Sequence, residues 1–252
     1  MAHAFRIAQN LEAPATPEQV WDAVATGPGL DSWFMGTSEV EPREGGAATL
    51  TLAGFTERST ITAWEPPVHL ATKGDEAPDG AYHQFEYRIE PRGGGITDIR
   101  FEHAGMLGED WEREYEGLSE GDPMYLRKLV EYVTYFPGRL ATPVSAFGPR
   151  VEGDKDAAMS VFRRGLGLPD GVAIGDRVHA EPPGVEPIDG VVDEVSASFL
   201  GVRTDDALYR FIRGYEGTTL VGHHLFRAAV DRKRAEAAWA AWLGELFARL
   251  VR

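Results

Sequence analysis

The sequence predicts an α+β fold in which a curved antiparallel β-sheet wraps around a long helix, and it predicts this arrangement twice in tandem. Short runs with strand-like alternation follow one another with tight turns between them, which is typical of an antiparallel meander. Each series of strands is followed by a longer amphipathic helix, and a curved sheet needs such a helix to cover its concave face. The same order of elements occurs once in each half of the chain.

The first two elements have clear local signals. Phe5, Ile7 and Leu11 alternate with polar residues, which indicates a half-buried strand. A short helix is predicted next, because Thr16 suits the N-cap position and Gln19, three residues later, completes a capping box.

A meander of strands then leads to the first long helix. Its last two strands show period-two patterns, at Phe85, Tyr87 and Ile89 and at Ile99, Phe101 and His103. Asp122 is predicted to cap the long helix, with Pro123 in its first turn. The apolar face of this helix consists of Leu126, Leu129, Val130 and Val133.

The second half repeats this order. The Pro- and Gly-rich segment before it reads as a linker without a first strand. Asp154 is predicted to cap the first helix of this half, and the last helix is predicted to begin near Asp231. The last helix has a strong apolar stripe at Trp239, Trp242, Leu243, Leu246, Phe247 and Leu250. We therefore expect a domain over residues 1–138, a linker over residues 139–153 and a second, degenerate copy over residues 154–252.

Composition disfavours several classes of function. The chain is acidic, with a formal net charge of −15, so we expect neither nucleic acid nor a membrane as a partner. It has no cysteine, which excludes disulfides, thiolate catalysis and cysteine-ligated metals. The N-terminus lacks the features of a signal peptide, and no stretch approaches the ~18 apolar residues that suggest a membrane span. The expected location is therefore the cytoplasm.

Several separated motifs occur in an order that resembles a known superfamily. They are Ala13-Pro14, Pro17-Glu18-Gln19-Val20-Trp21, Leu30, Trp33-Phe34, Glu41-Pro42-Arg43-Glu44-Gly45-Gly46, His103-Ala104-Gly105, Trp111 and the closing helix around Leu126, Leu129 and Tyr132. Over residues 3–138 this pattern resembles the SRPBCC or START-like (birch-pollen-allergen-like) superfamily, in particular bacterial homologues of the heat-shock-chaperone ATPase activator. The second half resembles a degenerate repeat of the same fold.

The resemblance implies a helix-grip fold with an apolar cavity between the sheet and the long helix. The superfamily includes lipid carriers, hormone receptors, polyketide aromatase/cyclases, resistance proteins and chaperone regulators, so the fold alone does not define a function. The Gly-Trp that the family usually has before its last helix is not clear here, where the chain has Gly117-Leu118 and Gly121-Asp122-Pro123. The entry of the helix and the mouth of the pocket are therefore left open.

The candidate ligand-binding residues are mainly aromatic, because helix-grip pockets are concave and mostly apolar with a few polar groups. They are Trp33, Phe34, Phe55, Trp64, Phe85, Tyr87, Phe101, His103, Trp111, Tyr125 and Leu129. Most of the aromatic residues are equally compatible with simple core packing. The imidazole of His103 is expected to orient a ligand carbonyl, to act as a general base or to bond a local carbonyl.

No pattern predicts a catalytic residue, a metal site or a cofactor. His223 and His224 are adjacent and so face opposite sides of a strand, which makes them poor joint metal ligands. The three glycines at residues 93–95 fit a turn between strands rather than a phosphate loop that opens a helix. The acidic residues from Glu109 to Glu120 are interpreted as a solvated loop, since no nucleophile accompanies them.

These observations favour non-catalytic binding of a hydrophobic or aromatic small molecule in the cavity between sheet and helix. Two alternatives stay open. One is an enzyme of the aromatase/cyclase or hydrolase type that moves protons with His103, Tyr87 or acidic residues. The other is a chaperone-regulating or other interaction module with a protein partner. The sequence contains no feature that identifies the ligand.

Overall fold

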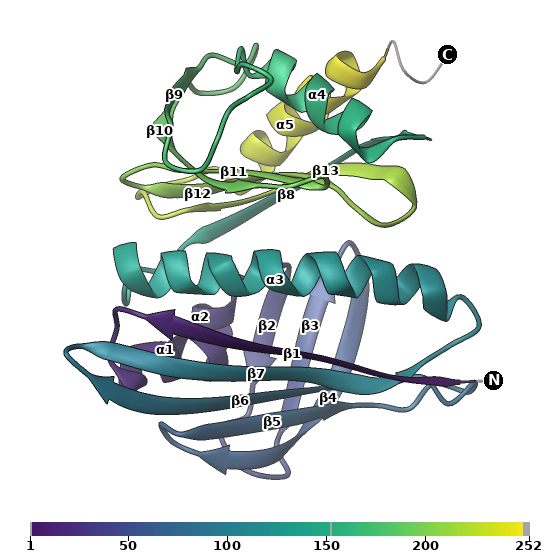
Figure 1. Cartoon of the computed structure of the whole chain (residues 1–252), viewed down its shortest axis with the longest axis vertical. Coiled ribbons are helices and arrows are strands. Elements are labelled where there is room, and N and C mark those ends of the chain that lie inside the picture. The colour runs from purple at the N-terminus through teal and green to yellow at the C-terminus, as the bar shows by residue number, and fades with distance from the viewer. Residues whose placement is uncertain (1, 152, 249–252) are drawn as a thin grey trace. The chain divides into compact units, whose positions relative to one another are not determined.

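The computed structural model describes residues 2–151 and 153–248 of the chain. It divides into two compact units, residues 1–140 and residues 141–252, and each has its own antiparallel sheet (Figure 1). Among the described residues, no helix combines the length and the apolar character that crossing a membrane requires.

The first unit contains seven strands and three helices. In chain order they are β1 (His3–Ala13), α1 (Pro17–Ala25), α2 (Gly27–Leu30), β2 (Thr37–Val40), β3 (Ala47–Leu52), β4 (Phe55–Glu65), β5 (His69–Gly74), β6 (Tyr82–Gly93), β7 (Ile96–Leu107) and α3 (Trp111–Tyr135). The strands form one sheet in the order β1-β7-β6-β5-β4-β3-β2, so the first strand pairs with the last strand of the meander. α3 lies across this sheet (Figure 1), and the predicted helix-grip fold is confirmed.

Local signals in the first unit behave as predicted. Gln19 N donates to Thr16 Oγ1 at 3.3 Å, and Thr16 N donates to Gln19 Oε1 at 2.8 Å, which completes the capping box of α1. β6 and β7 pair directly, and the two period-two patterns face each other residue by residue. The facing pairs are Phe85 with His103, Tyr87 with Phe101 and Ile89 with Ile99.

The long helix differs from the prediction at its start. α3 begins at Trp111 rather than after Asp122, and Pro123 lies inside it. The predicted cap at Asp122 was wrong because Asp before Pro matches an N-cap pattern locally. The observed start is also favourable, since Glu112 and Glu114 place two acidic side chains in the first turn of the helix. Most of the segment interpreted as an acidic loop is therefore the first part of α3, and Asp122 lies in the middle of this helix.

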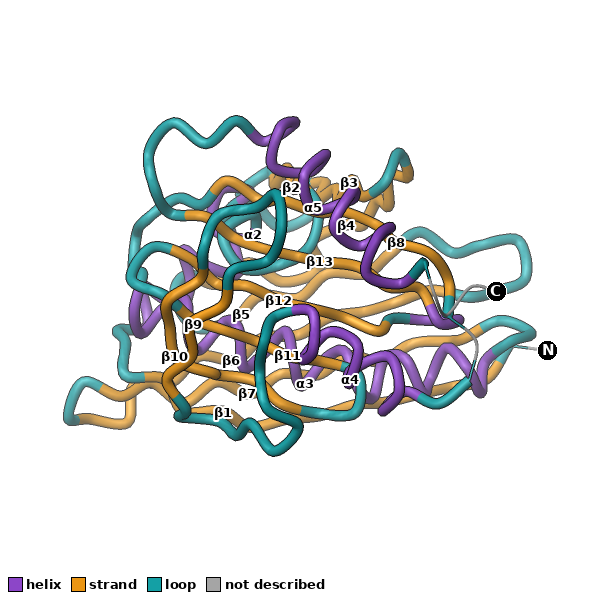
Figure 2. The backbone as a smooth tube through the Cα atoms, turned by 90° about the horizontal axis from the view of Figure 1, so that it is seen from above, coloured by secondary structure: helices purple, strands orange, loops and turns teal. Residues whose placement is uncertain are grey.

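The second unit repeats the first with one strand fewer. Its elements are β8 (Thr142–Arg150), α4 (Lys155–Gly165), β9 (Arg177–Ala180), β10 (Ile188–Val195), β11 (Phe199–Arg203), β12 (Ala207–Arg213), β13 (Thr218–Leu225) and α5 (Arg232–Phe247). The sheet order is β8-β13-β12-β11-β10-β9, so here too the first strand pairs with the last. Seen from above, α4 and α5 lie over the strands of this sheet (Figure 2).

The first strand of the second unit is the main correction to the predicted organisation. Residues 139–153 were expected to be a linker, yet β8 lies within them and pairs with β13. Its Pro and Gly content hid the strand, since Pro143 and Pro149 both read as turn residues. β8 is an edge strand, where a missing N–H is tolerated because no further strand needs it. The predicted apolar position Leu250 lies outside the described residues.

The core of the second unit combines aromatic rings with a buried ion pair. Phe162, Phe211 and Trp242 pack together, with ring centroids of Phe211 and Trp242 5.9 Å apart. Arg210 is fully buried and forms two hydrogen bonds of 2.9 Å to the carboxylate of Asp193. Gly201 makes room for this pair, because a Cβ at that position would overlap both side chains.

Removing one partner of this buried pair should destabilise the second unit strongly. We expect Asp193→Ala to lower its free energy of unfolding by about 3–5 kcal/mol, because the Arg210 charge would stay buried without compensation. The double variant Asp193→Leu with Arg210→Met should recover most of this loss, since apolar residues need no partner. Hydrogen exchange of the β10–β13 amides during urea unfolding measures the free energy of unfolding of both variants. An unchanged free energy in Asp193→Ala would contradict the stabilising role of the pair.

Candidate functional site

A cavity of about 520 Å³ lies in the first unit. Its lining comes from the strands β2 to β7 and from the helices α1, α2 and α3. The cavity is thus enclosed by the elements that the helix-grip fold brings together: the curved sheet, the short helices and the long helix. Its volume falls within the range of about 300–1,000 Å³ that is typical of small-molecule sites.

The inner part of the cavity is apolar and buried. Trp33, Leu70, Tyr87, Phe101 and Leu126 line it and are each at most 9% exposed. The indole of Trp33 donates to the carbonyl of Ala23 at 2.9 Å, which fixes the orientation of the ring without using a group that a ligand needs.

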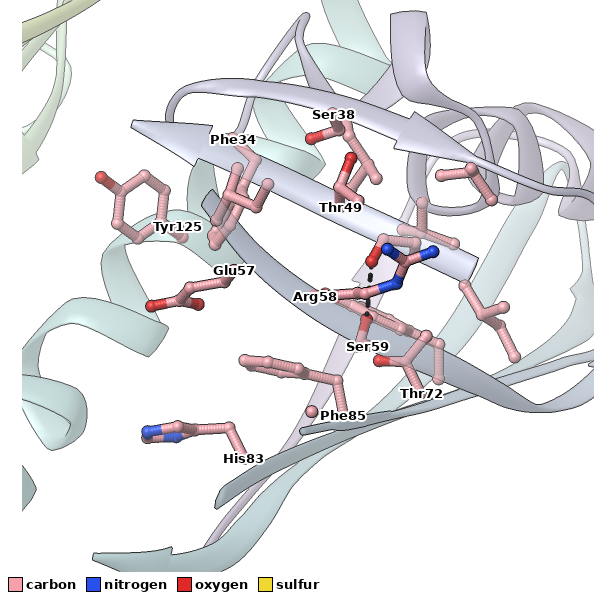
Figure 3. Close-up of a pocket in the computed structure, with 18 of the residues that line it drawn as sticks. Phe34, Ser38, Thr49, Glu57, Arg58, Ser59, Thr72, His83, Phe85 and Tyr125 are labelled. Carbon is pink, nitrogen blue, oxygen red and sulfur yellow. Dashed lines mark hydrogen bonds between the residues drawn. The ribbon is translucent and has the colours of Figure 1, made fainter. Parts of the chain in front are cut away.

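The outer part of the cavity is polar and open to solvent. Glu57 and Arg58 of β4 and Asp75 after β5 line it and are exposed. Figure 3 shows Ser59 and Thr72 on neighbouring strands, and it shows Glu57 on the same side of the cavity as His83 and Tyr125. This arrangement of an apolar interior and a polar rim suits a molecule with an apolar body.

Six of the predicted ligand-binding residues line the cavity. They are Trp33, Phe34, Phe85, Tyr87, Phe101 and Tyr125. Strand alternation on β6 and β7 puts Phe85, Tyr87 and Phe101 on the concave side. Tyr125 comes from the middle of α3, and Trp33 and Phe34 follow α2. That they bind a ligand stays a prediction.

The other five predicted residues do not line the cavity. Phe55 is 81% exposed where β4 begins, and the ring of Trp111 stacks on His3 with centroids 4.6 Å apart. Trp64 packs edge-on against Trp21 at 5.0 Å. Leu129 is fully buried in the core, and His103 is 2% exposed behind the cavity wall. Aromatic content alone does not distinguish core or surface positions from lining positions.

His103 takes part in a chain of polar side chains that sequence reasoning missed. His103 Nδ1 lies 2.8 Å from Asp122 Oδ2, and His103 Nε2 lies 2.9 Å from His83 Nδ1. We call Asp122, His103 and His83 the histidine chain. His83 Nε2 lies 3.3 Å from Glu114 Oε1, so both ends of the chain meet side chains of α3. The expectation that His103 contacts a ligand or a local carbonyl is replaced by these two contacts.

One sequence signal points to Asp122 in retrospect. Asp122 precedes Leu126 by four residues and Leu129 by seven, so it continues the apolar stripe of α3. A carboxylate on the buried face of a helix needs a partner, and His103 provides it. The false N-cap at Asp122 concealed this register.

Burial shifts the pKa of two groups at the site. Burial, followed by the neighbouring His103, lowers the pKa of His83, although Glu114 and Glu57 act in the opposite direction. Burial, and secondarily the charge of Asp122, raises the pKa of the Tyr87 phenol well above its ordinary value, so the hydroxyl keeps its proton. Both groups line the cavity in their neutral forms near neutral pH.

Two aromatic rings hold the histidine chain in place. The ring of Phe85 stacks on His103 with centroids 4.1 Å apart and an interplanar angle of 27°. Phe5 approaches His103 edge-on at 4.9 Å. Because imidazole rings rotate unless they are packed, these contacts preserve the orientation in which both ring nitrogens of His103 reach their partners.

The part of the chain that the structure describes contains no group of three or more His, Asp or Glu side chains placed to hold a metal ion. His223 packs against Trp239 with ring centroids 4.5 Å apart, and its Nδ1 accepts from the backbone N–H of Arg210 at 3.1 Å. Both histidines are buried.

Comparison with known proteins bears on the first unit. The family model for activator of Hsp90 ATPase homolog 1-like proteins matches residues 14–134. This match lies within the first unit, residues 1–140, which we call the activator-like domain. The resemblance predicted from the sequence motifs is confirmed at this level. Among curated proteins, none matches the sequence.

Solved structures similar to the activator-like domain come from several organisms. A protein from Mesorhizobium loti is 21% identical, with 50% of this chain and 95% of that chain covered and a TM-score of 0.45. The Aha1 dimer from Colwellia psychrerythraea is 17% identical, with 53% and 99% covered and a TM-score of 0.45. An HSP90 activator from Plasmodium falciparum is 17% identical, with 51% and 96% covered and a TM-score of 0.40.

The lowered pKa of His83 predicts how pH affects the activator-like domain. The unfolded histidine gains a proton as the pH falls through about 6.5, whereas the folded one resists until a lower pH. The contribution of neutral His83 to the free energy of unfolding is therefore complete above a pH of about 6.5 and is lost as the pH falls below it. We expect the free energy of unfolding of His83→Gln to fall less steeply as the pH decreases, because glutamine does not titrate. The His83 ring faces His103 of β7, Glu114 of α3 and Glu57 of β4, whose charges must be the same in both proteins.

Urea unfolding at a series of pH values, followed through NMR signals of β6 and β7, measures this effect. His179→Gln is the matched control, because His179 is exposed and lies in the second unit, so it should leave the pH dependence of the first unit unchanged. The same decrease in stability for His83→Gln and the original chain would show that His83 does not cause it.

Proposed function

We propose that the activator-like domain binds a hydrophobic or aromatic small molecule in its cavity. The observation that carries this proposal is the cavity of about 520 Å³ with a buried aromatic interior. Burying an apolar surface contributes roughly 25 cal/mol per Å², so a molecule of two or three rings gains affinity from this interior without any charged contact. The exposed rim at Glu57 and Arg58 provides the entrance.

Polar groups that the sheet holds in the cavity favour selective binding. The hydroxyls of Thr49, Ser59 and Thr72 lie on adjacent strands of the sheet, where the backbone holds them at set positions (Figure 3). Such groups orient a ligand whose body is bound by the aromatic interior. Catalysis forms no part of this proposal.

A second candidate function is favoured by the family match alone. The family is described by activation of the Hsp90 ATPase, so the activator-like domain is also a candidate regulator of such a chaperone. Adding the purified chain to the Hsp90-type chaperone of its own host tests this, with the ATPase rate as the measurement. Our proposal expects no change in this rate, and a stimulated rate would favour the regulator instead.

Filling the cavity should abolish binding. We expect Thr72→Trp to weaken binding of the neutral fluorescent probe N-phenylnaphthylamine at least about tenfold, because the indole would occupy the space that lies between β5 and α3. Thr62→Trp is the matched control, since Thr62 is exposed on β4 and does not line the cavity.

Fluorescence titration gives the affinities, and circular dichroism with thermal unfolding shows whether each variant is folded. Equal affinity in a folded Thr72→Trp variant and in Thr62→Trp would place the probe elsewhere. A chain that binds no apolar probe at all would count against the proposed function.

A further inference from the structure

Three polar contacts link α3 to the sheet through two imidazole rings. Asp122 contacts His103, and His103 contacts His83. Glu114 contacts the other nitrogen of His83. A carboxylate only accepts hydrogen bonds, so His103 Nδ1 and His83 Nε2 both donate to the carboxylates. The contact between the two rings needs one more proton, on His103 Nε2 or on His83 Nδ1. The three contacts together therefore require three N–H groups.

This number of N–H groups determines the charge of the pair. Two neutral imidazoles have only two N–H groups, so one of them is positively charged when every contact is made. An imidazole is a stronger base than a carboxylate, which places the additional proton on a histidine. We assign it to His103, because its Nδ1 lies 2.8 Å from the carboxylate of Asp122, whereas burial disfavours the charged form of His83. The lowering of the His83 pKa by His103 is the effect that such a charge produces.

The first half of α3, residues 111–122, is weakly packed. All of its residues are at least partly exposed, whereas the second half of the helix contributes buried side chains such as Leu126 and Leu129. Gly117 and Gly121 also lower its intrinsic helix stability. The contacts that its inner side makes with the sheet therefore decide whether this half stays in place.

These contacts are mostly ones that a proton can change. Trp111 stacks on His3 of β1 with ring centroids 4.6 Å apart. Glu114 and Asp122 follow on the same side of the helix, and each meets an imidazole. A contact between a carboxylate and an imidazole depends on the protons of the ring, because the ring must donate.

Loss of the additional proton leaves two N–H groups for three contacts, so one contact must open. Asp122 and His103 form the shorter contact, and their side chains are only 14% and 2% exposed. The contact of His83 with Glu114 is longer, at 3.3 Å, and its side chains are 32% and 37% exposed, so water replaces it at less cost. His83 then donates to His103 from Nδ1, and its bare Nε2 faces a carboxylate, which is also an acceptor.

We propose that Glu114 and the histidine chain form a pH-sensitive latch. The latch holds the first half of α3 on the sheet while the two imidazoles carry one additional proton, and its contact at Glu114 opens when that proton is lost. Histidines ordinarily change charge between about pH 5 and 8, so the latch opens as the pH rises through this range. A second proton on the pair, gained at lower pH, preserves the N–H that His83 offers to Glu114 and leaves this contact closed.

The surroundings of the two imidazoles contain other charged and titratable groups. Besides the two carboxylates of α3, Glu57 of β4 faces His83, and Tyr87 of β6 lies near Asp122 with a hydroxyl that keeps its proton. β1 faces the pair with the apolar ring of Phe5. Among these residue types, histidine is the one that ordinarily changes charge between about pH 5 and 8. This inference concerns the helix and does not depend on the proposed function.

Amide hydrogen exchange of the full chain tests the latch at about pH 6 and about pH 8.5, with each rate corrected for the intrinsic effect of pH. We expect the protection of residues 115–122 to fall about tenfold at the higher pH, because a hydrogen bond to a charged group is lost. Glu114→Gln should abolish this fall. The glutamine amide can accept from His83 Nε2 or donate to it, so it makes the contact in both proton states.

Two control variants separate the latch from its surroundings. Glu112→Gln removes the same charge from an exposed position in the first turn of the helix, and it should keep the fall in protection. His3→Phe keeps a ring on Trp111 without a group that titrates, and it should keep the fall as well. Constant protection in the original chain, or an equal fall in Glu114→Gln, would overturn the proposal.

Nitrogen-15 spectra of the imidazole rings test the proton count in the original chain. At about pH 6, His103 should carry protons on both nitrogens and His83 on Nε2. At about pH 8.5, both rings should carry their proton on Nδ1, a coordinated change that histidines with only a packing role do not require. A proton that stays on His83 Nε2 at both pH values would overturn the proposal, because the Glu114 contact would then stay closed.

Discussion

The direct pairing of β6 with β7 is the constraint on which the rest of the first unit depends. It places Phe85 opposite His103 and Tyr87 opposite Phe101, all on the concave face. A shift of one residue would turn each of these side chains to the outer face, because strand side chains alternate with a period of two. On that outer face Arg88 pairs with Arg100, which ion pairs with Glu86 and Glu90 make tolerable. The register thus separates an aromatic interior from a charged exterior.

α3 makes the cavity polar at selected points. Its residues Asp122, Tyr125 and Leu126 reach the cavity, and Asp122 bonds His103 on the sheet. This contact joins the helix to β7 by a hydrogen bond between a carboxylate and an imidazole, a stronger type than one between neutral groups. Since His103 then bonds His83, which lines the cavity, this contact links the helix to the cavity wall. Helix placement and the chemistry of the cavity are therefore coupled.

Sequence reasoning predicted the parts of this structure that depend on local periodicity. The alternation of Phe85, Tyr87 and Ile89 gave the face of β6, and Thr16 with Gln19 gave the start of α1, because both patterns are encoded within a few residues. It failed where a local signal competed with a tertiary one. Asp122 before Pro123 reads as a cap, yet the helix continues through both. Likewise the prolines of β8 read as turns, although an edge strand accepts them.

The contact between His103 and His83 could not be predicted from sequence in the same way, since it depends on the rotamers of residues from different strands and a distant helix. The two units also treat buried charge differently. Arg210 and Asp193 pair through two hydrogen bonds inside the second unit, although Arg210 Nε has no hydrogen-bond partner among the described residues. The histidine chain begins at a carboxylate in the same manner but ends at His83, which lines the cavity. A buried pair contributes to the stability of its own unit, whereas a polar chain that ends at a cavity joins the packing of the fold to the surface that a bound molecule meets.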